Sequence, residues 1–334
     1  MRIYSCLRRS SSEMVRAFIT GITGQDGSYL AEHLLERKYE VHGLIRPDCD
    51  VSETHLSDHA DEIGFHVGDL TDGAALERAI SVVGPDEIYH LGGQTHVGRS
   101  FDAVVETLAV NGMATVRLLE IARAVCPKAR IFNAASSEVF GRPEQLPQDE
   151  STPIAPVNPY GCAKALGLQM TRMYRETHGL FVVNGILYNH ESPRRPESFV
   201  TRKICRAAAS IKHGLQKELR LGDLAAERDW SDARDVVRGM WFALQHDRPD
   251  DYVLASGETH TVEEVVEVAF ETVDIDWKKH VKNDLSLKRP AEPNRLVGNP
   301  RYARNLLDWL PENDFRHLII GMTHADLREL APQK

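Results

Sequence analysis

The sequence predicts an α/β fold in which helices cover both faces of a parallel sheet, followed by a smaller lobe. Two observations carry this prediction: short apolar runs alternate with amphipathic stretches up to Asn189, and the first apolar run leads into a glycine-rich turn. Strands that are separated by helices form right-handed crossovers and therefore lie parallel. The alternation thus indicates a doubly wound sheet.

The short apolar runs are the expected strands, at residues 16–20, 40–45, 64–67, 87–91, 129–134 and 181–188. Stretches with apolar residues at helical spacing are the expected helices, at residues 28–37, 74–83, 107–125 and 160–178. After Asn189 a loop with prolines and charges leads into an irregular, helix-rich segment. We therefore expect one domain over residues 15–189 and a smaller, partly interleaved lobe over residues 190–334, with a return to the sheet near 232–258.

The composition is that of an ordinary globular protein, with 42% hydrophobic and 27% charged residues. A net charge of -9 argues against a broad nucleic-acid-binding surface. The five cysteines include no CxxC pair, so we expect neither a disulfide framework nor a metal site, and a cytoplasmic location. No apolar run reaches about 18 residues, the length that a membrane span needs.

Residues 1–14 are basic but lack the apolar core of a secretion signal. We expect them to form a disordered extension. Met14 stands directly before the first strand and is an alternative start of the chain.

The glycine-rich turn lies between the first strand and the first helix and has the spacing GxxGxxG. Glycines let the backbone approach a pyrophosphate, and the following helix N-terminus offers free N–H groups to it. The context of strand, turn and helix favours a dinucleotide site over a plain loop. It makes residues 15–189 a Rossmann-type NAD(P)-binding domain. The candidate residues of the turn are Gly21, Thr23, Gly24, Gln25, Asp26 and Gly27.

The residue after the second strand indicates the type of dinucleotide. An acidic residue there would favour NAD, whereas a basic residue would hold the 2′-phosphate of NADP. Arg46 stands at this place and predicts NADP. Because Asp48 follows closely, NAD stays open as the cofactor. The alternative for Arg46 is an ordinary surface arginine. Further candidates follow the third and fourth strands, namely Asp69, Leu70, Leu91, Gly92 and Gln94.

Tyr160 and Lys164 form a YxxxK pair at the start of a helix, on one helix face. A lysine ammonium near a phenol lowers the pKa of the tyrosine, which can then exchange a proton with a hydroxyl while hydride moves to nicotinamide. Ser136 and Glu138 follow the fifth strand, at the edge of the sheet where ligands bind. The alternative for Tyr160 and Lys164 is an exposed pair of side chains four residues apart on a helix. The alternative for Glu138 is a surface glutamate on the loop.

These motifs are similar to those of the extended short-chain dehydrogenase/reductase superfamily. The chain after residue 15 further resembles the GDP-mannose 4,6-dehydratase family, through segments such as ASSEVFG, NPYGCAK and RPAEPNRLVGNPRYA. The most family-specific segment is NHESPRR.

The resemblance implies an internal-redox dehydration of GDP-mannose to GDP-4-keto-6-deoxymannose, with NADP regenerated. It implies catalytic roles for Ser136, Glu138, Tyr160 and Lys164. The nucleotide-sugar contacts that it implies fall on Ser137, Asn189, Glu191, Arg194, Lys203, Arg228, Arg289 and Glu292.

Other functions stay open from the sequence. A 4-reductase, 4-epimerase or decarboxylase of a sugar nucleotide would use the same tyrosine and lysine, and a 4,6-dehydratase of another sugar nucleotide would also keep Glu138. A silent scaffold on the same fold is a further alternative, against which both Tyr160 and Lys164 argue. The resemblance also implies a homodimer or homotetramer, with helices 107–125 and 160–178 at the dimer contact. The family's loop after the second strand helps to build the tetramer, and here Pro47 and a shortened acidic loop depart from that pattern.

Overall fold

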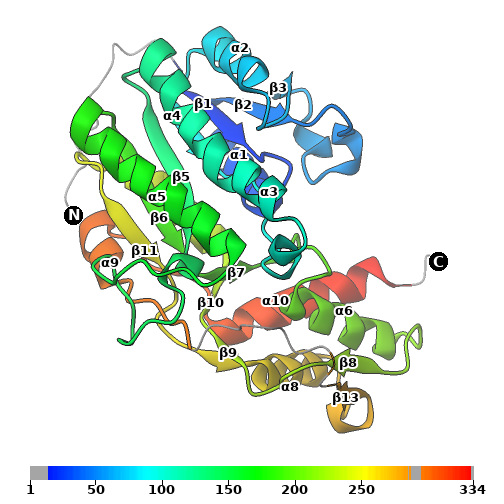
Figure 1. Ribbon diagram of the computed structural model, residues 1–334. Coiled ribbons are helices and arrows are strands. Elements are labelled where there is room, and N and C mark those ends of the chain that lie inside the picture. Colours follow the sequence, from blue (N-terminus) through cyan, green and yellow to red (C-terminus); the bar gives the residue numbers. More distant parts are fainter. Residues whose placement is uncertain (1–13, 285, 287–294, 332–334) are drawn as a thin grey trace.

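The computed structural model describes residues 14–284, 286 and 295–331. Of the expected N-terminal extension, only Met14 lies within the described residues. The described chain forms a seven-stranded parallel sheet with helices on both faces and a smaller helical lobe below it (Figure 1). The α/β Rossmann-type prediction is confirmed.

The central sheet has the strand order β3-β2-β1-β4-β5-β6-β11. Its strands are β1 Arg16–Thr20, β2 Glu40–Ile45, β3 Ile63–Val67, β4 Glu87–His90, β5 Arg130–Ser136, β6 Val182–Leu187 and β11 Asp251–Leu254. The order reverses between β1 and β4, and in such sheets a crevice opens at this point, outside the carboxyl ends of the strands.

The helices of this half are α1 Gln25–Glu36, α2 Gly73–Val83, α3 Val104–Thr107, α4 Ala114–Val125, α5 Pro159–His178, α7 Ala233–Gln245 and α9 Arg301–Leu307. Short 3-10 turns lie at η1 Val51–Glu53, η2 Ser57–His59, η3 Gly98–Phe101 and η5 Ser137–Phe140. Helix α1 begins at Gln25 rather than at Ser28, because the glycine turn itself supplies the first helical turn. The helix expected at 107–125 is interrupted by a π-helical segment, η4 Leu108–Met113.

Neighbouring residues of each strand pack into different cores, as in a sheet that is buried on both faces. On one face Ile19, Tyr89 and Phe132 pack with the apolar sides of α1 and α7. On the other face Phe18 and Ile88 pack with α2, α4 and α5. This burial on both faces explains why the strands read as continuous apolar runs in the sequence.

The smaller lobe has its own core. It contains α6 Val200–Lys212, α8 Val262–Thr272 and α10 Phe315–Glu329, whose apolar faces meet around residues such as Ile204, Phe270 and Met322. Short strand pairs complete it, formed by β7 Asn189–Glu191 with β10 Trp230–Asp232, β8 Leu219–Leu221 with β13 Val281–Asn283, and β9 Glu227–Arg228 with β12 His260–Thr261; a 3-10 turn, η6 Trp277–Lys279, precedes β13.

The chain passes between the two halves more than once. After β10 it returns as α7, which packs beside α1, and as β11, which pairs with β6 at the edge of the sheet. Among the helices described, none combines the length and the apolar character that crossing a bilayer requires.

The glycine turn generates a stability prediction. A Cβ atom on Gly27 would lie 2.2 Å from the carbonyl oxygen of Gly21, whereas a Cβ on Gly321 of α10 would meet nothing within 4 Å. Both glycines are helical, so alanine gains helix propensity at both positions. We expect Gly27→Ala to lower the thermal unfolding midpoint and Gly321→Ala to raise stability by about 0.5–1 kcal/mol. A Gly27→Ala protein as stable as Gly321→Ala would contradict the close approach.

Candidate active site

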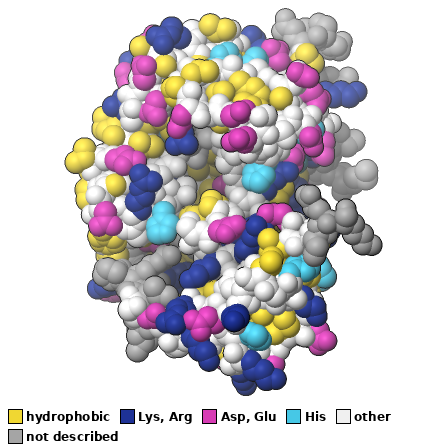
Figure 2. Space-filling model, turned by 90° about the vertical axis from the view of Figure 1, so that its right-hand side faces the viewer, with side chains coloured by type: hydrophobic (Ala, Val, Ile, Leu, Met, Phe, Trp, Pro, Cys, Tyr) yellow, Lys and Arg dark blue, Asp and Glu magenta, His cyan; other side chains and the backbone are white. Residues whose placement is uncertain are grey.

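A cavity of about 700 Å³ lies between the carboxyl edge of the sheet and the smaller lobe. The sheet side contributes Ser136 and Tyr160, and the lobe contributes Lys203, Arg228 and Trp230. Figure 2 shows this hollow on one face of the molecule, with charged side chains around it. The cavity is large enough for a small organic ligand and is lined by both polar and apolar groups.

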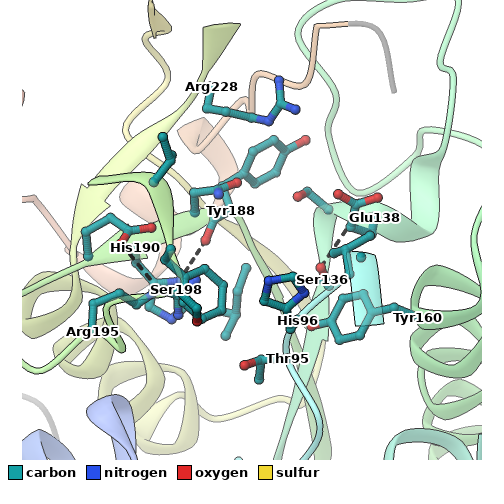
Figure 3. Close-up of a pocket in the computed structure, with 18 of the residues that line it drawn as sticks. Thr95, His96, Ser136, Glu138, Tyr160, Tyr188, His190, Arg195, Ser198 and Arg228 are labelled. Atoms are coloured by element: carbon teal, nitrogen blue, oxygen red, sulfur yellow. Dashed lines mark hydrogen bonds and ion pairs between the residues drawn. The ribbon is translucent and has the colours of Figure 1, made fainter. Parts of the chain in front are cut away.

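Ser136, Glu138 and Tyr160 meet on one wall of this cavity (Figure 3). Strand β5 ends at Ser136, and η5 carries Glu138 directly after it. The Ser136 hydroxyl oxygen accepts the backbone N–H of Glu138 at 3.3 Å. Burial raises the pKa of Tyr160, and the nearby Ser136 hydroxyl offsets part of this rise. Residues from three different elements, β5, η5 and α5, thus converge on one wall of the cavity.

Lys164 lies one turn along α5 from Tyr160. Its ammonium donates to the carbonyl oxygen of Ala134 at 2.7 Å and lies 5.9 Å from the centroid of the Tyr160 ring. Burial lowers the pKa of Lys164 to about 8, and burial raises the pKa of Tyr160 to about 12. The expectation that Lys164 lowers the pKa of Tyr160 is therefore not met in this structure, because desolvation dominates and the ammonium is directed at Ala134.

The glycine turn packs closely against the loop that follows β4. Gly21 has a φ of +72°, and a Cβ there would lie 2.7 Å from the Cα of Gly92. No side chain caps the N-terminus of α1, at Gly24. A tight turn that leads to an uncapped helix N-terminus is the arrangement that receives a pyrophosphate. Thr23, Gln25 and Gly27 belong to the same turn.

Arg46, Asp69 and Leu70 lie beyond this turn, after the carboxyl ends of β2 and β3. The Arg46 side chain is exposed, with its guanidinium 3.6 Å from the Asp48 carboxylate. Hydrogen bonds from Thr71, and further the charge of Arg46, lower the pKa of Asp69. Leu70 packs close to Gly92.

Gln94 continues this line of predicted cofactor residues towards the cavity. Its backbone N–H donates to the Asn111 side chain at 2.8 Å, and its carbonyl accepts from the same side chain at 2.7 Å. Asn111 lies in the π-helical segment η4, a distortion that often marks functional sites. Leu91, between Gly92 and the end of β4, lines the cavity itself.

Asp26 joins the glycine turn to the far side of the cavity. Its carboxylate lies 2.8 Å from the Nε2 atom of His190 in β7. Burial alone would raise the pKa of Asp26, but the charge and hydrogen bond of His190 outweigh it, so the pKa is lowered. Burial alone would lower the pKa of His190, yet Asp26 raises it. Each group thus shifts the pKa of the other in the direction that favours its charged form.

Four of the predicted substrate residues on β7, α6 and β9 line the cavity: Asn189, Glu191, Lys203 and Arg228. Ser137, beside the predicted catalytic serine, lines it as well. Arg289 and Glu292 lie outside the described residues.

Arg194 is placed differently from the sequence expectation. Its guanidinium packs 3.9 Å from the Tyr29 ring centroid, donates to the Ser28 hydroxyl at 3.0 Å and pairs with Glu32 at 2.6 Å. Arg194 therefore holds its segment against α1. Arg195 lines the cavity instead and pairs with Glu191 at 3.3 Å.

Sequence reasoning missed His190, Arg195 and Asn158. The first two lie in the NHESPRR segment, so the sequence offered them, but nothing in it distinguished Arg195 from Arg194. Asn158 donates a hydrogen bond to the Glu138 carboxylate. Because it precedes a proline at a helix start, its sequence position predicts only a helix cap. Within residues 14–284, 286 and 295–331, no three His, Cys, Asp or Glu side chains are grouped to hold a metal ion.

Comparisons with known proteins identify the family of the chain. The family model described as GDP-mannose 4,6 dehydratase matches residues 18–322. GDP-mannose 4,6 dehydratase 1 of Arabidopsis thaliana is 44% identical over 330 residues, which are 95% of this chain and 91% of that protein. GDP-mannose 4,6 dehydratase of Homo sapiens is 42% identical over 341 residues, covering 93% of this chain and 91% of that protein. The structure of UDP-glucose 4-epimerase from Thermus thermophilus in complex with NAD is similar with a TM-score of 0.82 and 25% identity, over 95% of this chain and all (100%) of that chain.

The Asp26–His190 pair generates a pH prediction. The raised pKa of His190 adds stability that is complete below about pH 6.5 and is lost as the pH rises through its folded value. The lowered pKa of Asp26 adds stability that is complete above about pH 3.9 and is lost as the pH falls through its folded value. We expect the difference in melting temperature between the wild type and Asp26→Asn to be largest between these limits.

The measurement is thermal unfolding of both proteins from about pH 3 to about pH 9. Glu36→Gln is the control, because the exposed Glu36 makes only a 3.9 Å contact with Arg37. A pH-independent difference for Asp26→Asn would argue against a charged pair.

Proposed function

Because the chain belongs to the GDP-mannose 4,6-dehydratase family, we propose that it converts GDP-mannose to GDP-4-keto-6-deoxymannose by internal-redox loss of water. The observation that carries this proposal is the convergence of Glu138 with Ser136, Tyr160 and Lys164 on one cavity. Simple oxidation or reduction of a hydroxyl needs the tyrosine and its partners. Elimination of water requires one further acid–base group, and the Glu138 carboxylate would provide it.

The residues of the glycine turn fit a dinucleotide cofactor, since Gly21 and Gly27 leave no room for a Cβ and α1 presents an uncapped N-terminus. We propose that this turn holds the pyrophosphate, that Asp69 and Leu70 border the adenine, and that Arg46 reaches the 2′-phosphate of NADP. NAD is the alternative, because the exposed Arg46 shares its charge with Asp48. A dinucleotide held there would supply reversible hydride transfer between carbons 4 and 6 of the sugar, with no net consumption of cofactor.

Tyr160 is the proposed base for the 4-hydroxyl proton. Ser136 and Tyr160 line the same cavity, so both hydroxyl groups can meet the reacting oxygen of a bound sugar. Because burial raises the pKa of Tyr160 to about 12, the free phenol stays protonated near neutral pH. A bound, oxidised nicotinamide would bring positive charge into the site and so favour loss of that proton.

Glu138 is the proposed acid–base group for the elimination. A 4-keto group acidifies the hydrogen on carbon 5. The Glu138 carboxylate takes this proton, the electron pair forms the bond between carbons 5 and 6, and the bond from carbon 6 to its oxygen breaks. The same proton then leaves with the 6-hydroxyl as water, which restores the carboxylate. Saturation of the bond between carbons 5 and 6 by hydride at carbon 6 also needs a proton at carbon 5, which balances the proton that Tyr160 took from the 4-hydroxyl.

The lobe side of the cavity supplies the proposed contacts to the nucleotide diphosphate. Lys203, Arg228 and Arg195 line it, and such side chains recognise phosphate oxygens well. Asn189 and Glu191 offer an amide and a carboxylate for the base or the sugar hydroxyls. Arg194 is not part of this set, since α1 engages its guanidinium.

The test is incubation with GDP-mannose and no added reductant, followed by mass analysis for a product that has lost one water. We expect product with no net change in reduced cofactor. Glu138→Gln should lower kcat by about 10²–10⁴-fold while single-turnover reduction of the cofactor persists, and Tyr160→Phe should abolish both. Unchanged product release by Glu138→Gln would overturn the assignment. Stoichiometric consumption of reduced cofactor would indicate a reductase.

We further propose that the chain forms a homodimer through the helical layer of α3, α4 and α5, which lie side by side in Figure 1. Apolar side chains are exposed there, among them Val104, Val105 (82% exposed), Met113 and Leu166. Exposed apolar patches of this kind mark interaction surfaces.

Light scattering tests this proposal. We expect twice the monomer mass for the wild type and the monomer mass for the double variant Val105→Glu, Met113→Glu, because buried charges disfavour the contact. Leu310→Glu is the control, since Leu310 is also exposed (64%) but lies after α9, outside this layer. A wild-type monomer, or a dimer that survives the double variant, would refute this contact.

A further inference from the structure

Asn158 uses both ends of its side chain at the entrance to α5. Its Oδ1 atom accepts the backbone N–H of Gly161 at 2.7 Å, which makes it the N-cap of the helix. Its Nδ2 atom donates to Oε2 of Glu138 at 2.7 Å. The opposite amide orientation would lose both bonds, because a carboxylate needs a donor and a backbone N–H needs an acceptor. The residue is buried, so neither bond is readily replaced by water.

The backbone around this contact is also tightly packed. A Cβ on Gly161 would lie 2.5 Å from the carbonyl oxygen of Glu138, so the first turn of α5 rests directly on η5. That same turn carries Tyr160, whose side chain lines the cavity together with Ser136 and Glu138. Asn158 therefore ties the carboxylate of Glu138 to the helix that carries the tyrosine.

This tie has a chemical consequence. A glutamate side chain has several freely rotating bonds, and elimination needs its carboxylate at one place, first for the carbon 5 hydrogen and then for the leaving hydroxyl. Misplacement of a reacting group by about 1 Å costs rate on the order of 10²-fold. A donated hydrogen bond also stabilises the ionised carboxylate, which is the form that can take a proton.

We propose that Asn158 is a positioning residue for the elimination step, which holds Glu138 in register with Tyr160 while it caps α5. This inference rests on the proposed function. It assigns Asn158 to one half of the reaction only: proton transfer to Tyr160 and hydride loss from carbon 4 do not use the Glu138 carboxylate.

Asn158→Ser is the informative variant. Serine is about as good an N-cap as asparagine, so α5 keeps its cap, but its side chain is too short to reach Glu138 as well. We expect a melting temperature and a KM for GDP-mannose close to those of the wild type. We expect kcat to fall about 10-fold to 100-fold, with reduced cofactor accumulating in a single turnover because carbon 4 is oxidised faster than water is lost.

Two further variants separate positioning from stability. Asn158→Asp keeps the size and the cap but sets a second carboxylate against Glu138, and we expect it to slow elimination at least as much as serine does. Asp314→Ser changes the N-cap of α10, whose side chain accepts the N–H of His317 at 2.8 Å, far along the chain from the cavity. It should leave both half-reactions at the wild-type rate.

The wild type is assayed first. If it yields no dehydrated product from GDP-mannose, the proposed function falls and this inference falls with it. If it turns over while Asn158→Ser has an unchanged kcat, or while both half-reactions slow by the same factor, the proposed function stands and the positioning role is overturned.

Discussion

The packing of the first turn of α5 onto the carboxyl end of β5 is the constraint on which the site depends. Gly161 meets the carbonyl oxygen of Glu138 with no room for a side chain, and the Lys164 ammonium binds the carbonyl oxygen of Ala134. These two contacts set the distance between the helix and the strand end. Once that distance is set, residues at the end of β5 and residues of α5 lie on the same reacting centre, although they are far apart in the chain.

A second set of polar contacts binds the glycine turn to the entry of the lobe. The Asp26 carboxylate meets His190, and the Gln25 side chain accepts from the Ser192 hydroxyl at 2.8 Å and donates to the carbonyl oxygen of His190 at 3.1 Å. Charges buried in this way stabilise a structure only when they are paired and hydrogen-bonded. The arrangement therefore fixes where the lobe stands over the turn, so that a cofactor and a substrate held by the two halves would face one another.

Desolvation shapes the chemistry of this site more than the spacing of its charges does. Tyr160 and Lys164 are both buried, and burial moves their pKa values in opposite directions, to about 12 and about 8, each towards the neutral form. Although the net charge of the protein is -9, the cavity itself is lined by the basic side chains of Lys203, Arg228 and Arg195.

The sequence by itself determined the parallel sheet and the glycine turn, and it predicted the reacting side chains, because these follow from local periodicity and from motifs of a few residues. It also indicated the family through the NHESPRR segment. Only the tertiary structure decided that Arg195 rather than Arg194 lines the cavity, that His190 pairs with Asp26, and that Asn158 holds Glu138. Each of these depends on which way a side chain points after distant segments have packed. A pattern in the sequence carries no information on that choice. Arg194 and Arg195 are adjacent, and each finds a carboxylate partner, Glu32 of α1 for Arg194 and Glu191 at the cavity for Arg195.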